Sequence, residues 1–152
     1  MPAWRQADHE LNMPLLAPRR EKFRKMFRGQ MPGNASRGTS LSFGDFGLVA
    51  QTRGWVSAAQ IESARKTLTH FTAKGGRVWI RIFPDKPISK QPLDHRGGGG
   101  KGEVVAHVAV IRPGLVLFEM GGLPKEAAKE AMRRAGHKLS VGTKFISKEE
   151  LI

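Results

Sequence analysis

Residues 77–102 read RVWIRIFPDKPISKQPLDHRGGGGKG, and the rest of the chain is interpreted around them. The first seven residues, 77–83, are rich in β-branched and aromatic types and predict a strand. Three prolines and five glycines follow, and these residue types do not hold regular structure. The apolar run 104–111 predicts another strand. The sequence therefore predicts a loop over residues 84–102, and loops of that length are usually functional or disordered.

A helix is predicted before this section and another after it. The first begins at Ser57, whose spacing to Gln60 is that of a capping box, and ends at Gly75. The second begins with Pro124 at the first helical position and ends at Gly136. Their expected buried faces are Ile61, Ala64, Leu68 and Phe71 in the first, and Ala128, Ala131, Met132 and Ala135 in the second.

Short strands complete the predicted fold. Residues 41–56 predict extended structure interrupted by glycines, and residues 144–147 predict a last strand. Residues 104–112 and 115–120 predict two strands joined at an Arg-Pro-Gly turn, a pattern typical of a hairpin. Two helices beside strands that do not strictly alternate with them predict an α+β domain, with the helices packed on a mainly antiparallel sheet.

Composition limits the functional classes. The 152 residues suit one domain, and 39% hydrophobic with 26% charged residues is typical of a globular protein. The absence of cysteine excludes disulfides, thiolate metal sites and cysteine catalysis. Because the longest apolar run is about eight residues, we expect no membrane span and no membrane partner. The first eighteen residues contain two acids and no apolar core, so no secretory signal is expected.

Positive charge is concentrated in one part of the chain. The net charge is +13, and residues 19–101 hold 17 Lys or Arg against five acids. Such an imbalance opposes compact folding but favours binding to a polyanion. Nucleic acid is the leading predicted partner, and an anionic membrane surface or simple solubility are the alternatives.

Three segments are distinguished on this basis: an extension (residues 1–18), a basic arm (residues 19–40) and a single α+β domain (residues 41–152). Residues 19–28 read RREKFRKMFR, with six basic residues in ten. Phe23, Met26 and Phe27 have the spacing of a short amphipathic turn. We expect the cations of the arm to contact phosphates and its aromatic rings to pack on protein or on bases; a solvated charge run is the alternative.

No catalytic or cofactor motif is supported by its context. Gly97, Gly99 and Gly102 satisfy G-x-G-x-x-G, but they follow a proline-rich loop and precede a strand instead of opening a helix. The five histidines lack metal-ligand spacing, and no nucleophile-elbow context surrounds any serine. We therefore expect no enzyme, no metal and no cofactor. Glycine backbone and flanking cations instead predict that the loop approaches RNA phosphates, a plain linker being the alternative.

Several stretches resemble the large-subunit ribosomal protein sixteen family, a bacterial and organellar family with archaeal and eukaryotic relatives. The resemblance covers roughly residues 18–147. It is carried by PRREKFRKMFRG, GTSLSFGDFGLVAQTRGWVSAAQIESAR, KGGRVWIRIFPDKPISKQPLDHRGGGGKG and VIRPGLVLFEMGGLPKEAAKEAMRRAGHKL. At the glycine tip the family commonly reads R-M-G-x-G-K-G, whereas this chain has Gly97 where Met is usual and Gly99 where a basic residue often stands.

The resemblance implies a non-catalytic α+β protein of the alpha/beta-hammerhead type in a bacterial or organellar ribosome. Its expected partners are large-subunit ribosomal RNA near the peptidyl transferase region, transfer RNA in the A site and neighbouring ribosomal proteins, and its expected roles include late subunit assembly. A free RNA-binding assembly factor is the alternative. Charge and resemblance together give as candidate RNA-binding residues Arg19, Arg20, Lys22, Arg24, Lys25, Arg28, Arg77, Arg81, Lys86, Lys90, Arg96, Gly98, Gly100, Lys101 and Gly102.

Overall fold

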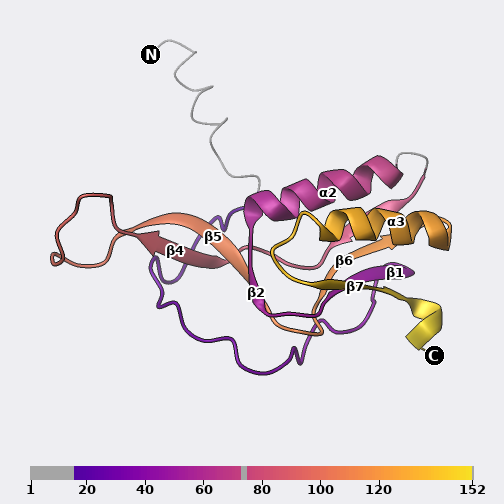
Figure 1. The fold of residues 1–152 in the computed structure, drawn as a ribbon, viewed down its shortest axis with the longest axis horizontal. Helices are drawn as coiled ribbons and strands as arrows, with labels where there is room; N and C mark the ends of the chain where they lie inside the picture. Colours follow the sequence, from indigo (N-terminus) through magenta and orange to yellow (C-terminus); the bar gives the residue numbers. More distant parts are fainter. Residues whose placement is uncertain (1–15, 73–74, 152) are drawn as a thin grey trace, which may run out of the picture.

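The computed structural model describes residues 16–72 and 75–151, within which seven strands and two α-helices are found (Figure 1). In chain order they are β1 (Phe46–Ala50), β2 (Gly54–Ser57), α2 (Ala58–Thr72), β3 (Arg77–Ile80), β4 (Lys86–Lys90), β5 (Glu103–Ile111), β6 (Val116–Gly121), α3 (Lys125–Gly136) and β7 (Thr143–Ser147), followed by the short 3-10 helix η1 (Lys148–Leu151). The predicted α+β class is confirmed. The extension before residue 16 lies outside the described residues.

The strands form two antiparallel sheets that share one bent ribbon. The larger sheet has the order β3-β6-β1-β7 and the smaller one β2-β5-β4. β1 pairs with β6, and β2 pairs with β5. Between these two ladders, Ala50 and Leu115 are joined by a 2.9 Å hydrogen bond from the Ala50 amide to the Leu115 carbonyl. Residues 46–57 and 108–120 therefore run beside each other from one sheet into the other.

This pairing shows that the predicted hairpin between residues 104–112 and 115–120 was wrong. The Arg-Pro-Gly turn exists, because the Leu115 amide donates to the Arg112 carbonyl over 3.3 Å. The Gly114 amide, however, donates to the Ala50 carbonyl over 2.8 Å. The turn thus bends the segment of residues 108–120, which stays paired with residues 46–57 on both sides of the bend. β5 and β6 therefore belong to different sheets.

The prediction of a loop without regular structure over residues 84–102 was also wrong. β4 occupies residues 86–90 and pairs with β5, so that Pro87 lies opposite His107. A proline is tolerated here because β4 is an edge strand of its sheet, where one side of the backbone needs no ladder hydrogen bonds. The loop between the paired strands is consequently shorter than predicted. It comprises residues 91–102, which we call the hairpin loop.

Helix α2 agrees closely with its sequence signals. The Ser57 amide donates to Gln60 Oε1 at 3.0 Å and the Gln60 amide donates to Ser57 Oγ at 3.3 Å, which is the reciprocal bonding of a capping box. Gly75 has a φ of 119°, and its amide donates to the Thr72 carbonyl. Ile61, Ala64 and Leu68 are buried, as the apolar stripe predicted, whereas Phe71 is only partly buried and packs against the core.

Helix α3 buries the predicted face, but both of its ends differ from expectation. Pro124 is the N-cap residue, with ψ at 146°, and so precedes the first helical position. Gly136 is buried inside the last turn and does not stop the helix in a left-handed conformation. A Cβ at position 136 would lie 2.5 Å from Thr143 Oγ1, so glycine permits close packing of α3 on β7.

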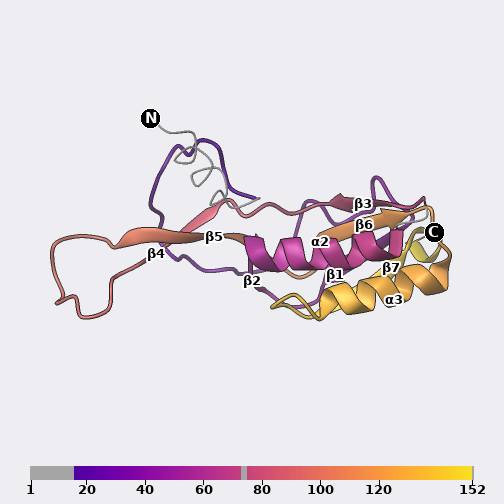
Figure 2. The same cartoon turned by 90° about the horizontal axis from the view of Figure 1, so that it is seen from above.

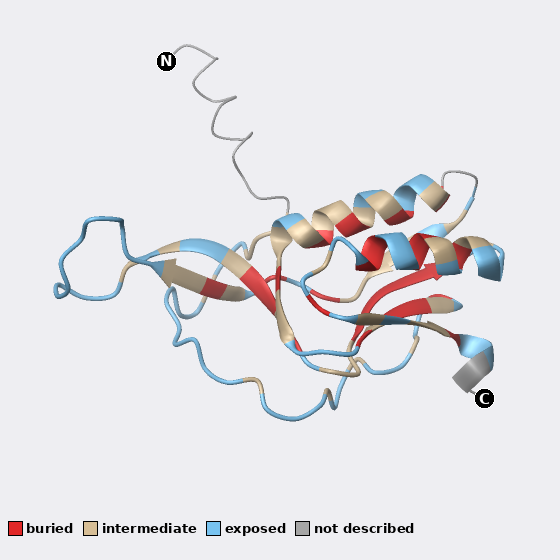
Figure 3. Cartoon of the chain, viewed as in Figure 1, coloured by how far each residue is buried: buried red, intermediate tan, exposed pale blue. Residues whose placement is uncertain are grey.

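The core lies between the two helices and the larger sheet, and Figure 3 shows its buried residues on the inner faces of both layers. α2 and α3 lie side by side over this sheet (Figure 2). β6 is buried along its whole length, because residues 41–44 cover the face that the helices do not: a Cβ at Gly44 would lie 2.6 Å from the Met120 carbonyl oxygen. The smaller sheet and the hairpin loop extend away from this core (Figure 1).

Candidate nucleic-acid interface

The basic arm runs along the smaller sheet without forming a helix. Residues 19–45 contain no helix or strand, so the amphipathic turn considered for residues 23–27 is not formed. The carboxylate of Glu21 contacts His107 Nε2 on β5, and Lys86 on β4 donates to the carbonyl of Arg28. The arm is therefore bound at two points to the strands that carry the hairpin loop. Its six predicted RNA-binding cations are all exposed: Arg19, Arg20, Lys22, Arg24, Lys25 and Arg28.

A reciprocal pair of hydrogen bonds joins the arm to the end of the hairpin loop. Lys25 Nζ donates to the Lys101 carbonyl at 2.9 Å, and Lys101 Nζ donates to the Met26 carbonyl at 2.7 Å. The partners of the first bond are 76 residues apart in sequence, and those of the second are 75 residues apart. Because these bonds use backbone carbonyls, they fix the positions of the arm and of the hairpin loop without neutralising the charge of either lysine. The arm and the hairpin loop thus present their cations on one continuous surface.

The hairpin loop has an exposed tip in which the backbone is the main surface. Arg96 and the four glycines after it are exposed, and Gly98, Gly99 and Gly100 have φ values of 115°, 81° and 104°. Left-handed backbone of this kind favours glycine. Gly97 differs, because its φ is not in that region and a Cβ there would meet nothing within 4 Å. Backbone amides and Arg96 are therefore the groups that the tip can offer to a phosphate.

Arg81, although predicted to bind RNA, is bonded to a buried carboxylate of the chain. Its guanidinium forms an ion pair with Glu119, whose side chain is 0% exposed, and lies 5.3 Å from the ring centroid of Phe43. Burial raises the pKa of Glu119, but hydrogen bonds from the amides of Gly44, Phe43 and Ser42 and from Arg81 outweigh burial and lower the pKa below its ordinary value. The pair thereby fastens residues 42–44 to β6.

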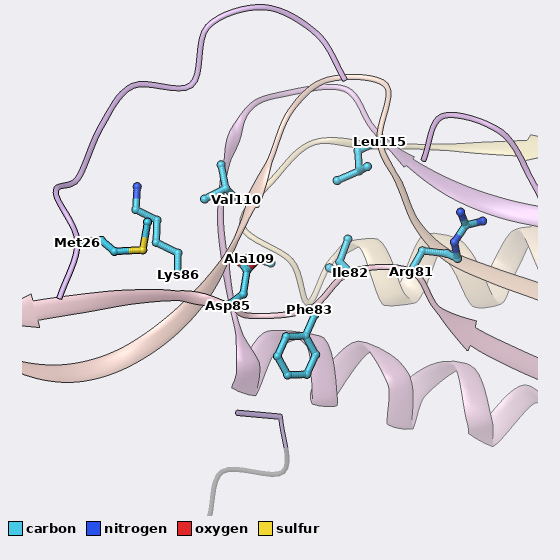
Figure 4. A pocket seen from close by; sticks show the side chains of 9 residues that line it. All are labelled: Met26, Arg81, Ile82, Phe83, Asp85, Lys86, Ala109, Val110 and Leu115. Atoms are coloured by element: carbon cyan, nitrogen blue, oxygen red, sulfur yellow. The ribbon is translucent and has the colours of Figure 1, made fainter. Parts of the chain in front are cut away.

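A basic-edged hollow lies beneath the arm where the two sheets meet. Its volume is about 500 Å³, and Met26 of the arm forms part of its wall. Figure 4 shows Met26 and Lys86 at one end, with Arg81 and Leu115 at the other. The remaining lining residues are Ile82, Phe83, Asp85, Ala109 and Val110. Since the wall includes the arm, this hollow keeps its shape only while the arm stays on the sheet.

The other predicted residues fall in different places. Lys86 and Lys90 are the first and last residues of β4 and so belong to the smaller sheet. Lys90 lies opposite Glu103, and Lys86 Nζ lies 5.0 Å from the ring centroid of Trp55. Arg77 begins β3, which lies at the end of the molecule away from the hairpin loop (Figure 2). Arg77 is therefore not part of the surface formed by the arm and the loop.

A comparison with known protein families bears directly on this surface. The model of the family described as ribosomal protein L16p/L10e matches residues 18–146, which include the arm, both sheets, both helices and the hairpin loop. The chain belongs to the ribosomal protein L16p/L10e family. It is accordingly a structural constituent of the large ribosomal subunit that acts in translation and is not an enzyme. Its location is the ribosome, and its partners are ribosomal RNA and other ribosomal proteins.

Membership of the L16p/L10e family accounts for an exposed cationic surface, because proteins of the ribosome bind RNA. Within residues 16–72 and 75–151, no group of three His, Asp or Glu side chains could hold a metal ion. In the same described residues, no helix is long and apolar enough to cross a membrane.

Two features of this L16p/L10e chain were missed by sequence reasoning. Glu119 was not singled out, although a lone acid inside the run LVLFEM is a signal for a paired, buried charge. The link between Lys25 and Lys101 had no local signal, because it depends on where the arm crosses the smaller sheet.

Proposed function

We propose that the arm and the hairpin loop bind large-subunit ribosomal RNA near the peptidyl transferase region as a single surface, with the loop tip directed to transfer RNA in the A site. The observation that carries this proposal is the reciprocal bonding of Lys25 and Lys101, which joins the basic arm to the hairpin loop. Ribosomal RNA bound by the arm would then set the position from which the loop extends. The same surface supports late assembly, because it holds RNA segments together.

The length of the hairpin loop suits a reach toward a second RNA. Twelve residues that go out and return span at most about 20 Å beyond the end of the sheet. The tip has little side-chain bulk, so its backbone can approach a crowded RNA cleft closely. Arg96 supplies a charge at the start of that tip, in the exposed part of the loop.

A single charge removed from the tip tests the transfer-RNA proposal. Arg96→Ala is preferred to a change at Lys101, because Lys101 also holds the arm through the Met26 carbonyl. Lys144→Ala is the matched control. Lys144 is an exposed cation on β7, which is an edge strand of the larger sheet, whereas the hairpin loop joins two strands of the smaller sheet. Both variants are incorporated into ribosomes, and transfer-RNA binding to the A site is measured by filter retention.

We expect Arg96→Ala ribosomes to sediment normally and to bind A-site transfer RNA more weakly, by about tenfold if one charge-assisted contact is lost. The Lys144→Ala ribosomes should match wild type. Equal A-site binding in all three preparations would remove transfer RNA from the proposal. For the ribosomal RNA contact, the affinity of the isolated chain should fall steeply with salt, because each neutralised phosphate releases counterions; a flat response would contradict it.

A further inference from the structure

Phe27 exposes an aromatic ring at the point where the arm meets the hairpin loop. Its side chain is 88% exposed, the highest value among the large hydrophobic side chains in the described part of the chain. The ring is not among the residues that pack on the hydrophobic core. Covering a phenyl ring that would otherwise stay in water is favourable, in proportion to the apolar area that is removed from water. The exposed ring of Phe27 therefore offers an apolar surface on which a bound molecule could stack.

The ring is nevertheless held in position. Lys101 Nζ lies 4.9 Å from its centroid, and the same ammonium donates to the carbonyl of Met26, the preceding residue. Lys101 thus occupies one side of the ring through a cation–π contact and fixes its surroundings through the backbone. The exposed area leaves the remaining face open to solvent. A flat apolar group could stack on that face without first ordering the side chain.

The charges beside the ring identify the kind of molecule that covers it. Residues 22–28 contain Lys22, Arg24, Lys25 and Arg28 and no acid, and all four cations are exposed. A partner at this place must therefore bring negative charge together with a flat apolar face. RNA combines the two, because each phosphate carries a charge and each base has a π-face. An apolar patch of a protein partner would bring the face without the charge.

The geometry points to an unpaired base. In an A-form helix both faces of each base are covered by neighbouring base pairs, whereas bases in loops and bulges are available for stacking on aromatic side chains. We propose that Phe27 is a stacking residue for one unpaired nucleobase, with the cations of residues 22–28 on the flanking phosphates. This inference rests on the proposed RNA-binding function and adds to it a stacking contact with a base, beside the contacts with phosphates.

A pair of oligomers with equal charge separates stacking from phosphate binding. The full chain is titrated with single-stranded oligoadenylate and with an abasic oligonucleotide of the same length and phosphate number. Phe27→Leu keeps an apolar side chain but removes the π-face, and Phe27→Trp keeps an aromatic ring. We expect Phe27→Leu to bind oligoadenylate about fivefold or more weakly than wild type, Phe27→Trp to match wild type, and all three proteins to bind the abasic oligomer equally.

Several results would overturn the inference. If Phe27→Leu matches wild type on oligoadenylate, Phe27 does not stack on a base. The same conclusion holds if its affinities for oligoadenylate and for the abasic oligomer fall by the same factor. If the wild-type chain binds neither oligoadenylate nor large-subunit ribosomal RNA, the proposed function fails together with this inference. Wild-type binding to ribosomal RNA with no change in Phe27→Leu refutes the inference alone.

Photocrosslinking within large subunits provides an independent measurement. Ultraviolet irradiation joins stacked aromatic side chains directly to bases, and mass spectrometry of digested subunits locates the joined residue. We expect a nucleotide on the peptide that contains Phe27. Finding that peptide joined to a ribosomal protein, with no nucleotide adduct, would show that a protein covers the ring and would overturn the proposal.

Discussion

Replacing Arg81 with methionine should destabilise the fold, because it removes the counter-charge of a buried carboxylate. Glu119 is 0% exposed and accepts hydrogen bonds from the amides of Phe43 and Gly44 at 2.6 and 2.7 Å as well as from Arg81. Methionine keeps an unbranched stem like the inner part of the arginine side chain but leaves the charge of Glu119 to the amides alone. The substitution therefore tests a charge effect more than a packing effect.

The magnitude follows from the partners that remain. Breaking a fully buried ion pair costs about 3–5 kcal/mol. Here the amides still bind the carboxylate, and the side chain of Arg81 is 19% exposed, so that water partly replaces it. We expect the free energy of unfolding to fall by about 2–3 kcal/mol, near the value of a hydrogen bond to a charged group. In urea the midpoint should fall by about 1–2 M.

A double-mutant cycle with Glu119→Gln isolates the pair. The two single variants should each be less stable than wild type, and the double variant should be more stable than additivity predicts, with a coupling energy of about 1 kcal/mol or more. If Arg81 instead serves RNA directly, Arg81→Met will unfold at the wild-type urea midpoint and will lower the salt dependence of RNA binding. That outcome, or a coupling energy near zero, would refute the structural role.

Acid should reduce the advantage of the wild type over Glu119→Gln: the pKa of Glu119 is lowered in the folded chain, so its stabilisation is present above the ordinary value of 4.5 and is lost as pH falls through the folded pKa. Urea unfolding from about pH 6 down to about pH 3 measures this, and a constant difference would contradict it. Gly102→Ala should lower the melting temperature, because its Cβ would meet the backbone of Lys90 at the foot of the hairpin loop, whereas Gly97→Ala, which meets nothing within 4 Å, should melt like wild type. Equal melting of the two glycine variants would show that the foot of the loop can adjust.

The helices could be predicted because their signals are local. The capping box of Ser57 and Gln60 lies within one turn, and the apolar stripe of α2 is set by a single core face. Strand pairing is not local in this sense. The turn before Leu115 looks like a hairpin turn, and only the distant Ala50, which accepts from Gly114, shows that the strand continues into another sheet.

The candidate site was predictable in composition but not in arrangement. Clustered cations and glycines were sufficient to indicate RNA. The same criterion also selected Arg81. The sequence does not show that this cation is bonded to Glu119, which lies 38 residues later on another strand. Pro87 argued against a strand at residues 86–90, because the edge position that tolerates proline depends on the order of strands in the sheet.

The bent ribbon of residues 46–57 and 108–120 has a mechanical consequence. Because the same two backbone segments belong to both sheets, the smaller sheet is a cantilever fixed at its base and not a hinged appendage. To deflect it, the hydrogen bonds that join Ala50 to Gly114 and Leu115 would have to stretch. A load applied at the loop is therefore carried into the helix-covered core, and we expect compliance in the hairpin loop, residues 91–102, which lies beyond the last paired residues.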